Sequence, residues 1–422
     1  MPGPLGSGLR SFKARSPCQM NELSSLGIIL LLALLAGHLV KLLRIPEVTG
    51  YVLAGVALGP SALGWVSSEN LAALQVLSEV ALGLILFSIG SVFEYSRFAR
   101  FGRTILYLTL AESVLAAGLV TMGMLLAGQP WQVAFLLGAV AVATAPASTL
   151  MVIRECNSKG PLSDTLLGII AVNNIFCLSA YILVASLIDF TASLGGATPI
   201  FEALYGALFP LVWQLLGSAA LGYLVGLLLA GWARNIVEHG EAQILLAGCV
   251  LLCVGVALFL DLSPLVASLA VGATMANLSA RSQRLFATLT RTDPPFYAIF
   301  FVIAGADLDV RLIPSMGALG VLYLFARASG KFLGAAWGAR RLQLELAVQR
   351  FLGFGLMAQA GLAIGIALAV DRRFVAYREV VTTVVLASVV VYEMIGPIST
   401  KFAIVRSGES RPHDPSPAGL LD

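Results

Sequence analysis

Gly168-Ile-Ile-Ala-Val-Asn-Asn-Ile-Phe-Cys-Leu-Ser-Ala-Tyr181 places two adjacent amides, Asn173 and Asn174, inside an otherwise apolar segment. Each amide carries donors and acceptors that hydrocarbon cannot satisfy. Polar groups at such a depth usually face the interior of a helix bundle or a water-filled cavity. The pair is therefore a candidate functional site, and it is a site without a charge of its own.

The composition of the whole chain is that of a polytopic membrane protein. Of its 422 residues, 58% are hydrophobic and only 12% are charged, whereas about 25% of the residues of a soluble domain are charged. The net charge of +3 gives no support to a nucleic-acid partner. The cysteines and histidines lack the spacing of metal ligands, and no nucleotide-binding fingerprint occurs. The sequence predicts neither an enzyme nor a metal or other cofactor.

Apolar segments of about 20 residues, the length that a bilayer core requires, follow one another from Leu23 onward. Residues 1–22 are predicted to be a disordered extension, and residues 403–422 a short cytoplasmic tail. Between them we predict an all-α protein of about thirteen transmembrane helices, at residues 23–43, 47–64, 71–91, 104–127, 131–153, 164–188, 202–232, 242–260, 263–280, 295–306, 313–338, 349–370 and 377–402.

The Lys and Arg residues gather in alternate connections between these helices. Cytoplasmic loops hold the excess of such residues, so the pattern predicts a multi-pass protein of the cell (inner) membrane with a cytoplasmic C-terminus. Arg10, Lys13 and Arg15 then lie on the outer side, against this rule. A translation start at Met20 would remove them, and N-terminal sequencing of the native protein tests that hypothesis.

Two of the predicted helices are interrupted. Ala143-Thr-Ala-Pro-Ala-Ser-Thr149 contains Pro146, which lacks a backbone donor and clashes with the preceding turn. Gly353-Phe-Gly-Leu-Met-Ala-Gln-Ala-Gly361 is loosened by its glycines. Paired breaks in the two halves of a chain indicate an inverted-repeat transporter with its site at the breaks, although each break alone could be a packing kink. The polar candidates at the breaks are Thr144, Ser148, Thr149 and Gln359, which as ordinary helix residues would bond their own backbone.

Several stretches together resemble the monovalent cation:proton antiporter-2 family of sodium/proton and potassium/proton exchangers. They include Ile45-Pro-Glu-Val-Thr-Gly-Tyr-Val-Leu-Ala-Gly-Val-Ala-Leu-Gly-Pro60, Phe300-Phe-Val-Ile-Ala-Gly-Ala-Asp-Leu-Asp309 and Glu393-Met-Ile-Gly-Pro397. The resemblance runs from about Leu23 to Lys401.

The resemblance implies a homodimer in the lipid bilayer, with monovalent cations and protons as its transported partners. It implies a core of helices at about 104–188 and 313–402, in which two discontinuous helices cross, and dimerisation helices at about 23–91 and 202–306. In that family, Asp-Asp or Asn-Asp after the first crossing binds either a proton or a cation. Here the motif is Asn173-Asn174, and an amide does not ionise.

Four charged residues inside the predicted helices are candidates to replace the missing carboxylates. Arg327 and Lys331 share one helix face, and in relatives the lysine can pair with the first acid of the motif. Glu393 is expected to form a structural ion pair with one of them, and Glu112 is a candidate replacement ion or proton carrier. Lys331 is either locked to Glu393 or is itself a proton carrier.

Three functions remain open on this sequence. The first is secondary antiport of sodium or potassium against protons by alternating access. The second is an uncoupled channel, or a transport-inactive sensor or scaffold, on the same fold. The third is a carrier of an anion or a neutral polar solute, because positive half-helix ends and two amides could hold such a ligand.

Overall fold

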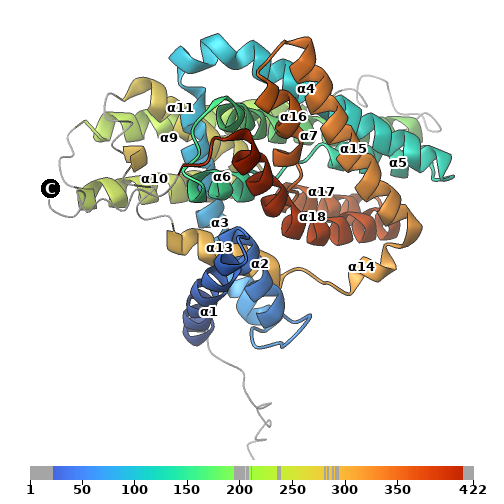
Figure 1. The fold of residues 1–422 in the computed structure, drawn as a ribbon, viewed down its shortest axis with the longest axis horizontal. Coiled ribbons are helices and arrows are strands. Elements are labelled where there is room, and N and C mark those ends of the chain that lie inside the picture. The colour runs from blue at the N-terminus through green and yellow to red at the C-terminus, as the bar shows by residue number, and fades with distance from the viewer. Residues whose placement is uncertain are drawn as a thin grey trace, which may run out of the picture.

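The computed structural model describes residues 22–193, 205, 209–210, 212–234, 239–279, 282, 285–287, 289 and 294–411. Every predicted apolar segment overlaps a helix or a pair of helices in that part of the chain, as Figure 1 shows. The helices are α1 (Glu22–Leu42), α2 (Glu47–Leu58), α3 (Ser68–Gly90), α4 (Tyr95–Leu126), α5 (Trp131–Ala141), α6 (Pro146–Glu155), α7 (Pro161–Ser193), η2 (Trp213–Gly217), α9 (Ser218–Trp232), α10 (His239–Phe259), α11 (Pro264–Leu278), α13 (Pro294–Ala306), α14 (Leu312–Ser315), α15 (Gly317–Arg341), α16 (Leu346–Gly355), α17 (Gly361–Arg373) and α18 (Arg378–Ser407).

Within the described residues, eight helical stretches are long and apolar enough to cross a membrane. Three shorter apolar helices, α2, α11 and α13, accompany them. The structure thus confirms a multi-pass all-helical fold, while the number of thirteen membrane crossings stays a prediction. The predicted disordered extension lies almost wholly outside the described residues.

Several helix ends differ from the predicted ones, among them the end of α2 at Leu58 instead of residue 64. Helix α4 begins at Tyr95 instead of residue 104. Its first turns contain Arg97, Arg100 and Arg103, which interrupt the apolar run on which the prediction was based. Helix α18 continues to Ser407, and Gly408 ends it in a left-handed conformation with φ of +80°. Residues 403–407 are therefore helical and do not belong to an irregular tail.

Both predicted interruptions are present, and the two interrupted helices cross. Helix α5 ends at Ala141, and Pro146 occupies the first turn of α6, where its missing N–H costs nothing. Helix α16 ends at Gly355, and α17 begins at Gly361. The backbone N–H of Ala145 donates to the carbonyl of Ala358 at 2.9 Å, so one break is bonded directly to the other.

The helices pack in two groups, which we call the crossing bundle and the flanking bundle. The crossing bundle contains α4 to α7 and α14 to α18, and its largest interface joins α4 to α15. The flanking bundle contains α1 to α3, α9 to α11 and α13, and α11 packs there against both α9 and α3. In Figure 1 the flanking bundle occupies the left and lower parts of the molecule, and the crossing bundle the right.

Two glycines bring α15 into backbone contact with α4. A Cβ atom on Gly330 would lie 2.4 Å from the Cα atom of Ala116, and one on Gly334 would lie 2.5 Å from the Cα atom of Glu112. No other residue type fits such a distance. The close approach places Lys331, which lies between these glycines, beside Glu112.

Candidate functional site

Arg327 closes the crossing from the side of α15. Its guanidinium donates to the carbonyl oxygens of Met357 at 2.9 Å and Ala143 at 2.6 Å, one from each break. It also stacks on the ring of Tyr392, 4.3 Å from the ring centroid. These carbonyls follow the C-terminal ends of α5 and α16, which carry partial negative charge. A fully buried cation is thus stabilised by two helix ends without a carboxylate.

Lys331 binds the same break and also a carboxylate. Its ammonium lies 2.6 Å from Oε2 of Glu112, and both side chains are fully buried. It also donates to the carbonyl of Val142 at 2.7 Å and to the hydroxyl of Thr144 at 2.9 Å. The ammonium therefore uses its three donors on one charge and two dipoles, which offsets the cost of its burial.

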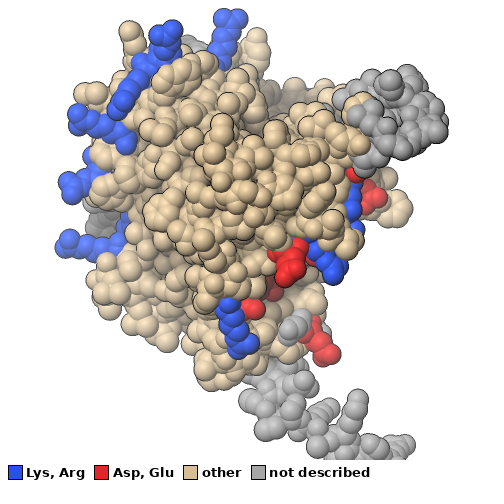
Figure 2. Space-filling view, turned by 90° about the vertical axis from the view of Figure 1, so that its right-hand side faces the viewer, with Lys and Arg blue, Asp and Glu red and all other residues tan. Residues whose placement is uncertain are grey.

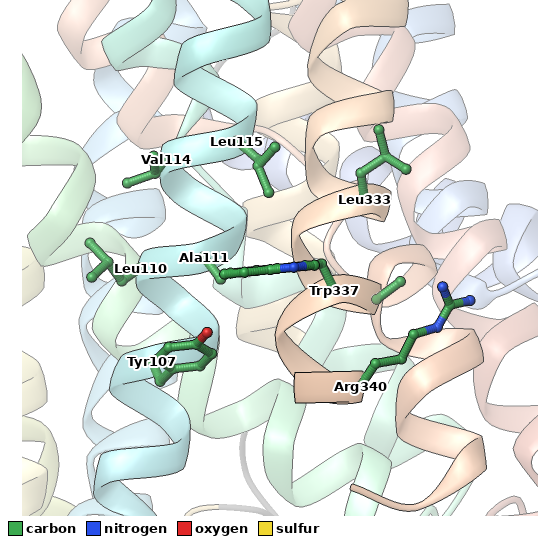
Figure 3. Close-up of a pocket in the computed structure, with 9 residues that line it drawn as sticks. Tyr107, Leu110, Ala111, Val114, Leu115, Leu333, Trp337 and Arg340 are labelled. Atoms are coloured by element: carbon green, nitrogen blue, oxygen red, sulfur yellow. The ribbon is translucent and has the colours of Figure 1, made fainter. Parts of the chain in front are cut away.

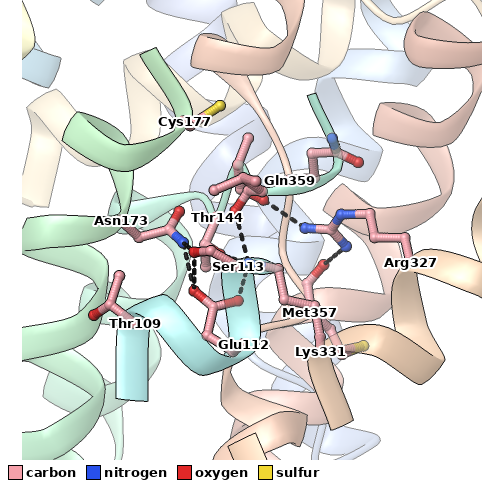
Figure 4. A network of polar contacts seen from close by, with 12 residues as sticks. Thr109, Glu112, Ser113, Thr144, Asn173, Cys177, Arg327, Lys331, Met357 and Gln359 are labelled. Atoms are coloured by element: carbon pink, nitrogen blue, oxygen red, sulfur yellow. Dashed lines mark hydrogen bonds and ion pairs between the residues drawn. The ribbon is translucent and has the colours of Figure 1, made fainter. Parts of the chain in front are cut away.

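Asn173 joins this pair through its amide. Its Nδ2 atom donates to Oε1 of Glu112 at 2.6 Å, as Figure 4 shows. The carboxylate of Glu112 projects from α4 to the position between Asn173 and Lys331, where an acid of the motif would meet the lysine. One carboxylate is therefore present beside the charge-free motif, and α4 supplies it.

Glu393 does not form the expected ion pair with Arg327 or Lys331. Its side chain is 2% exposed, and neither of its carboxylate oxygens has a hydrogen-bond partner among the described residues. The prediction was wrong because both cations are already held by the helix ends and by Glu112. Glu393 lies instead with Asn174 at a small cavity between the bundles.

The other predicted polar residues differ in the contacts that their side chains make. Gln359 donates to the carbonyl of Val140 at 3.2 Å and to the hydroxyl of Tyr323 at 3.0 Å, so it fastens one break to α5 and α15. The hydroxyl of Thr149 lies 3.3 Å from the carbonyl of Ala145, four residues earlier, and 3.4 Å from the carbonyl of Gly355 at the end of α16, so it contacts the other break as well as its own helix. Ser148 is buried and its hydroxyl has no partner in the described structure.

Three residues at the site were missed by the sequence reasoning. Ser113 donates to Glu112 at 3.1 Å and is within 3.4 Å of the Asn173 amide. Tyr323 binds Gln359, and Tyr392 supports Arg327. Ser113 follows Glu112 directly in the sequence and could have been flagged as a polar neighbour, whereas nothing in the sequence connects the two tyrosines to the crossing.

The C-terminal end of α6 also connects the two bundles. Arg154 donates to the hydroxyls of Tyr297 at 3.0 Å and Ser88 at 2.5 Å, both in the flanking bundle. Glu155 accepts from the backbone N–H of Glu47 at 2.8 Å and pairs with Lys401 at 2.8 Å. Two adjacent residues of one half-helix thus attach the crossing bundle to its neighbour at one face.

A surface groove lies elsewhere, away from the crossing. A groove of about 740 Å³ runs between α4 and α15 and is lined by Tyr107, Leu110, Val114, Leu333 and Trp337 (Figure 3). These side chains are apolar or aromatic, and several of them are about half exposed. Arg340 in the last turn of α15 is the charged residue of the lining, and no carboxylate belongs to it. Its chemistry suits a hydrocarbon environment and not an ion.

The geometry can now be compared with known proteins. Residues 27–406 match the family model described as sodium/hydrogen exchanger, transmembrane. The chain is 25% identical over 321 residues to the ammonium/H⁺ antiporter subunit AmhT of Alkalihalophilus pseudofirmus, covering 75% of this chain and 79% of that relative.

Two solved structures of the sodium/proton antiporter MjNhaP1 of Methanocaldococcus jannaschii resemble the fold. One, at pH 8, has a TM-score of 0.67 at 16% identity and covers 91% of this chain and 98% of the other. The second, from an electron-microscopy map, has a TM-score of 0.69 at 16% identity, with coverages of 93% and 99%. At such identity the likeness concerns the fold alone. The family match over almost the whole length, together with the crossed breaks, establishes that this chain belongs to the sodium/hydrogen exchanger family of membrane transport proteins.

Proposed function

We propose that the protein is a secondary antiporter that exchanges a monovalent cation for protons, with Glu112 as the carboxylate that its motif lacks. The observation that carries this proposal is the contact of one buried carboxylate with both Asn173 and Lys331, each at 2.6 Å. A carboxylate can hold a proton or a negative charge, and an amide cannot. Family membership supports the same reaction.

The coupling follows from the charges of the Glu112–Lys331 pair. When Glu112 takes a proton, Lys331 keeps its bonds to the carbonyl of Val142 and the hydroxyl of Thr144, and the buried pair gains one positive charge. When the carboxylate is ionised, the pair is neutral. A cation nearby is therefore repelled while the proton is bound and accepted once the proton has left, because like charges repel strongly at low dielectric constant.

The alternatives that rested on a charge-free site lose their main ground. An uncoupled channel or an inactive scaffold was suggested by the absence of both motif carboxylates, and a carrier of anions or neutral solutes by the helix ends and amides alone. Glu112 restores a negative charge next to Asn173. The positive ends of α6 and α17 face a cavity that Glu393 lines, so a carboxylate already stands where an anion would bind.

The substrate includes at least one of Na⁺, K⁺, Li⁺ and NH₄⁺. The relative AmhT is named for ammonium and the structural neighbour for sodium. We would reconstitute the full chain in proteoliposomes with an internal pH dye and add each cation across pH 6 to 9. Wild type should exchange protons for at least one cation, and Glu112→Gln should not. Glu79→Gln is the matched control, because this half-exposed carboxylate lies in the flanking bundle. Exchange that survives in Glu112→Gln would refute the role of Glu112.

A second experiment tests whether the native protein exchanges protons without the two motif carboxylates. The variant Asn173→Asp/Asn174→Asp restores two carboxylates. If wild type shows no exchange with any of the four cations and only this double variant does, the proposed antiport is wrong for the native protein. Currents on solid-supported membranes that ignore pH would then favour the uncoupled channel.

The membrane arrangement is part of the proposal. Figure 2 shows most of the visible Lys and Arg side chains along one edge of the molecule, and Asp and Glu toward the opposite edge. Lys41, Arg154 and Lys401 belong to helix ends that meet at one face through Glu47 and Glu155. We place this face and the C-terminus in the cytoplasm of a cell whose inner membrane holds the protein.

The bundles also suggest the moving parts. The division into a crossing and a flanking bundle supports a mobile core and a dimerisation domain, with the core at about 104–188 and 313–402. The flanking helices carry exposed apolar residues such as Leu216, Leu224 and Leu228, which a second copy or lipid would cover. Cross-linking of single-cysteine variants on α9 in native membranes tests a homodimer, and the absence of any dimer band would argue against it.

A further inference from the structure

A small cavity lies between the crossing and the flanking bundles, on the side of the half-helix N-termini. It has a volume of about 30 Å³ and is lined by Asn174, Glu393 and the first residues of α6 and α17. Leu82, Leu265 and Phe300 of the flanking bundle line it as well. The cavity is therefore bounded by polar groups on one side and by apolar side chains on the other.

Three oxygen acceptors at this cavity have no donor among the described residues. They are both carboxylate oxygens of Glu393 and the Oδ1 atom of Asn174, in side chains that are 2% and 6% exposed. A buried carboxylate without partners is strongly unfavourable. It is relieved either by a proton or by a cation, and the amide oxygen next to it adds a ligand without adding a competing charge.

The size and the surroundings select the kind of cation. A volume of about 30 Å³ holds one or two particles of the size of water, which excludes a cation that keeps its hydration shell. The N-terminal ends of α6 and α17 carry no side-chain cap and direct partial positive charge toward the cavity. One carboxylate whose charge is partly offset by two such ends suits a single positive charge and not a divalent ion.

We propose that Glu393 and Asn174 bind the transported cation, as a dehydrated monovalent ion held by carboxylate and amide oxygens, at a site distinct from the Glu112–Lys331 pair. This inference rests on the proposed antiport and assigns its two substrates to different carboxylates. Glu112 exchanges the proton beside Lys331, and Glu393 receives the cation on the other side of the breaks. Leu82, Leu265 and Phe300 cover the cation until the two bundles move apart.

Cation binding by the purified full chain, without any pH gradient, tests this assignment. Thermal unfolding would be followed at increasing NaCl, KCl, LiCl or NH₄Cl, with choline chloride keeping the ionic strength constant. Wild type should be stabilised saturably by at least one cation. Glu393→Gln should weaken the apparent affinity by about tenfold or more, since a charged ligand is lost. Asn174→Ala should weaken it less.

Controls keep the test decisive. Glu379→Gln removes an exposed carboxylate from the same helix and should bind cations as wild type does. Glu393→Asp keeps the charge, and it shows whether the fold tolerates a change at this position if Glu393→Gln does not fold. Wild-type affinity in both Glu393→Gln and Asn174→Ala would overturn the proposal. Cation binding that depends on Glu393 without any proton exchange would instead overturn the proposed antiport and leave this site standing.

Discussion

Replacement of Glu112 by Gln removes one negative charge and little else. The new amide oxygen can still accept from Asn173, and Lys331 keeps its bonds to the carbonyl of Val142 and the hydroxyl of Thr144. The partner of a fully buried ammonium is lost, however. Breaking a buried pair from one side costs about 3–5 kcal/mol, because an uncompensated charge remains. We expect a loss of this size in the free energy of unfolding.

Lys331→Met should cost a similar amount, since it strands the carboxylate of Glu112. The double variant Glu112→Gln/Lys331→Met removes both charges and keeps the side-chain volumes. Replacing a buried ion pair by neutral groups of similar shape is often neutral or stabilising. Lys331→Met also leaves the carbonyl of Val142 without its donor, at about 1–3 kcal/mol. We therefore expect the double variant to lose about that amount and less than Lys331→Met alone, so that the two single losses are far from additive.

The assay is equilibrium unfolding of the four proteins in mixed micelles of SDS and a mild detergent, followed by far-ultraviolet circular dichroism. Proton exchange in proteoliposomes is recorded alongside and should be absent from all three variants. A double variant that loses the sum of the two single losses would refute the reasoning. It would mean that Glu112 and Lys331 contribute independently and that their 2.6 Å contact is not a coupled pair.

Three further predictions follow from the packing and from the two ends of the crossing bundle. Gly334→Ala should push α15 away from α4 and abolish exchange, because its Cβ would lie 2.5 Å from the Cα of Glu112. As a control, Gly118→Ala in α4 meets no atom within 4 Å and should transport as wild type does. Equal activity of the two variants would contradict the packing argument. Arg327→Met should destabilise the protein by about 2–6 kcal/mol in the same unfolding assay. It leaves the carbonyls of Met357 and Ala143 without a donor, and each such carbonyl costs about 1–3 kcal/mol. Arg340→Met at the end of α15 is the control, and the prediction fails if both variants unfold alike. Glu409→Ala should release residues 408–411 from the start of α7, where the carboxylate accepts from the backbone N–H groups of Leu162 and Ser163. Arg411 of this segment donates its backbone N–H to the carbonyl of Cys156, and burial and the neighbouring Glu155 raise the pKa of the Cys156 thiol. Maleimide labelling of Cys156 at pH 8, in a background without the other cysteines, should therefore accelerate severalfold in Glu409→Ala, and Glu345→Ala should label at the wild-type rate. An unchanged rate in Glu409→Ala would show that the segment does not shield Cys156.

The sequence by itself determined the class of fold and the place of the site. Apolar runs long enough for a bilayer can hardly form anything but helices, since every backbone group must be satisfied within its own segment. Pro146 and the glycines from Gly353 to Gly361 interrupt two of them for local reasons that a sequence records directly. The paired breaks and the motif at Asn173-Asn174 therefore indicate the crossing from the sequence alone.

Only the tertiary structure decided which charges meet. The partners of Lys331 come from α4, α5 and the first break, far apart in the chain, and the close approach of α4 depends on Gly330 and Gly334. Sequence reasoning assigned Glu393 to a cation, because it could not weigh a carboxylate partner against carbonyls at helix ends. Those ends exist only once the broken helices have crossed. The carbonyls at these ends bind Arg327 without any carboxylate. Glu112 is therefore free to pair with Lys331, and Glu393 lies beside Asn174 without a cation partner.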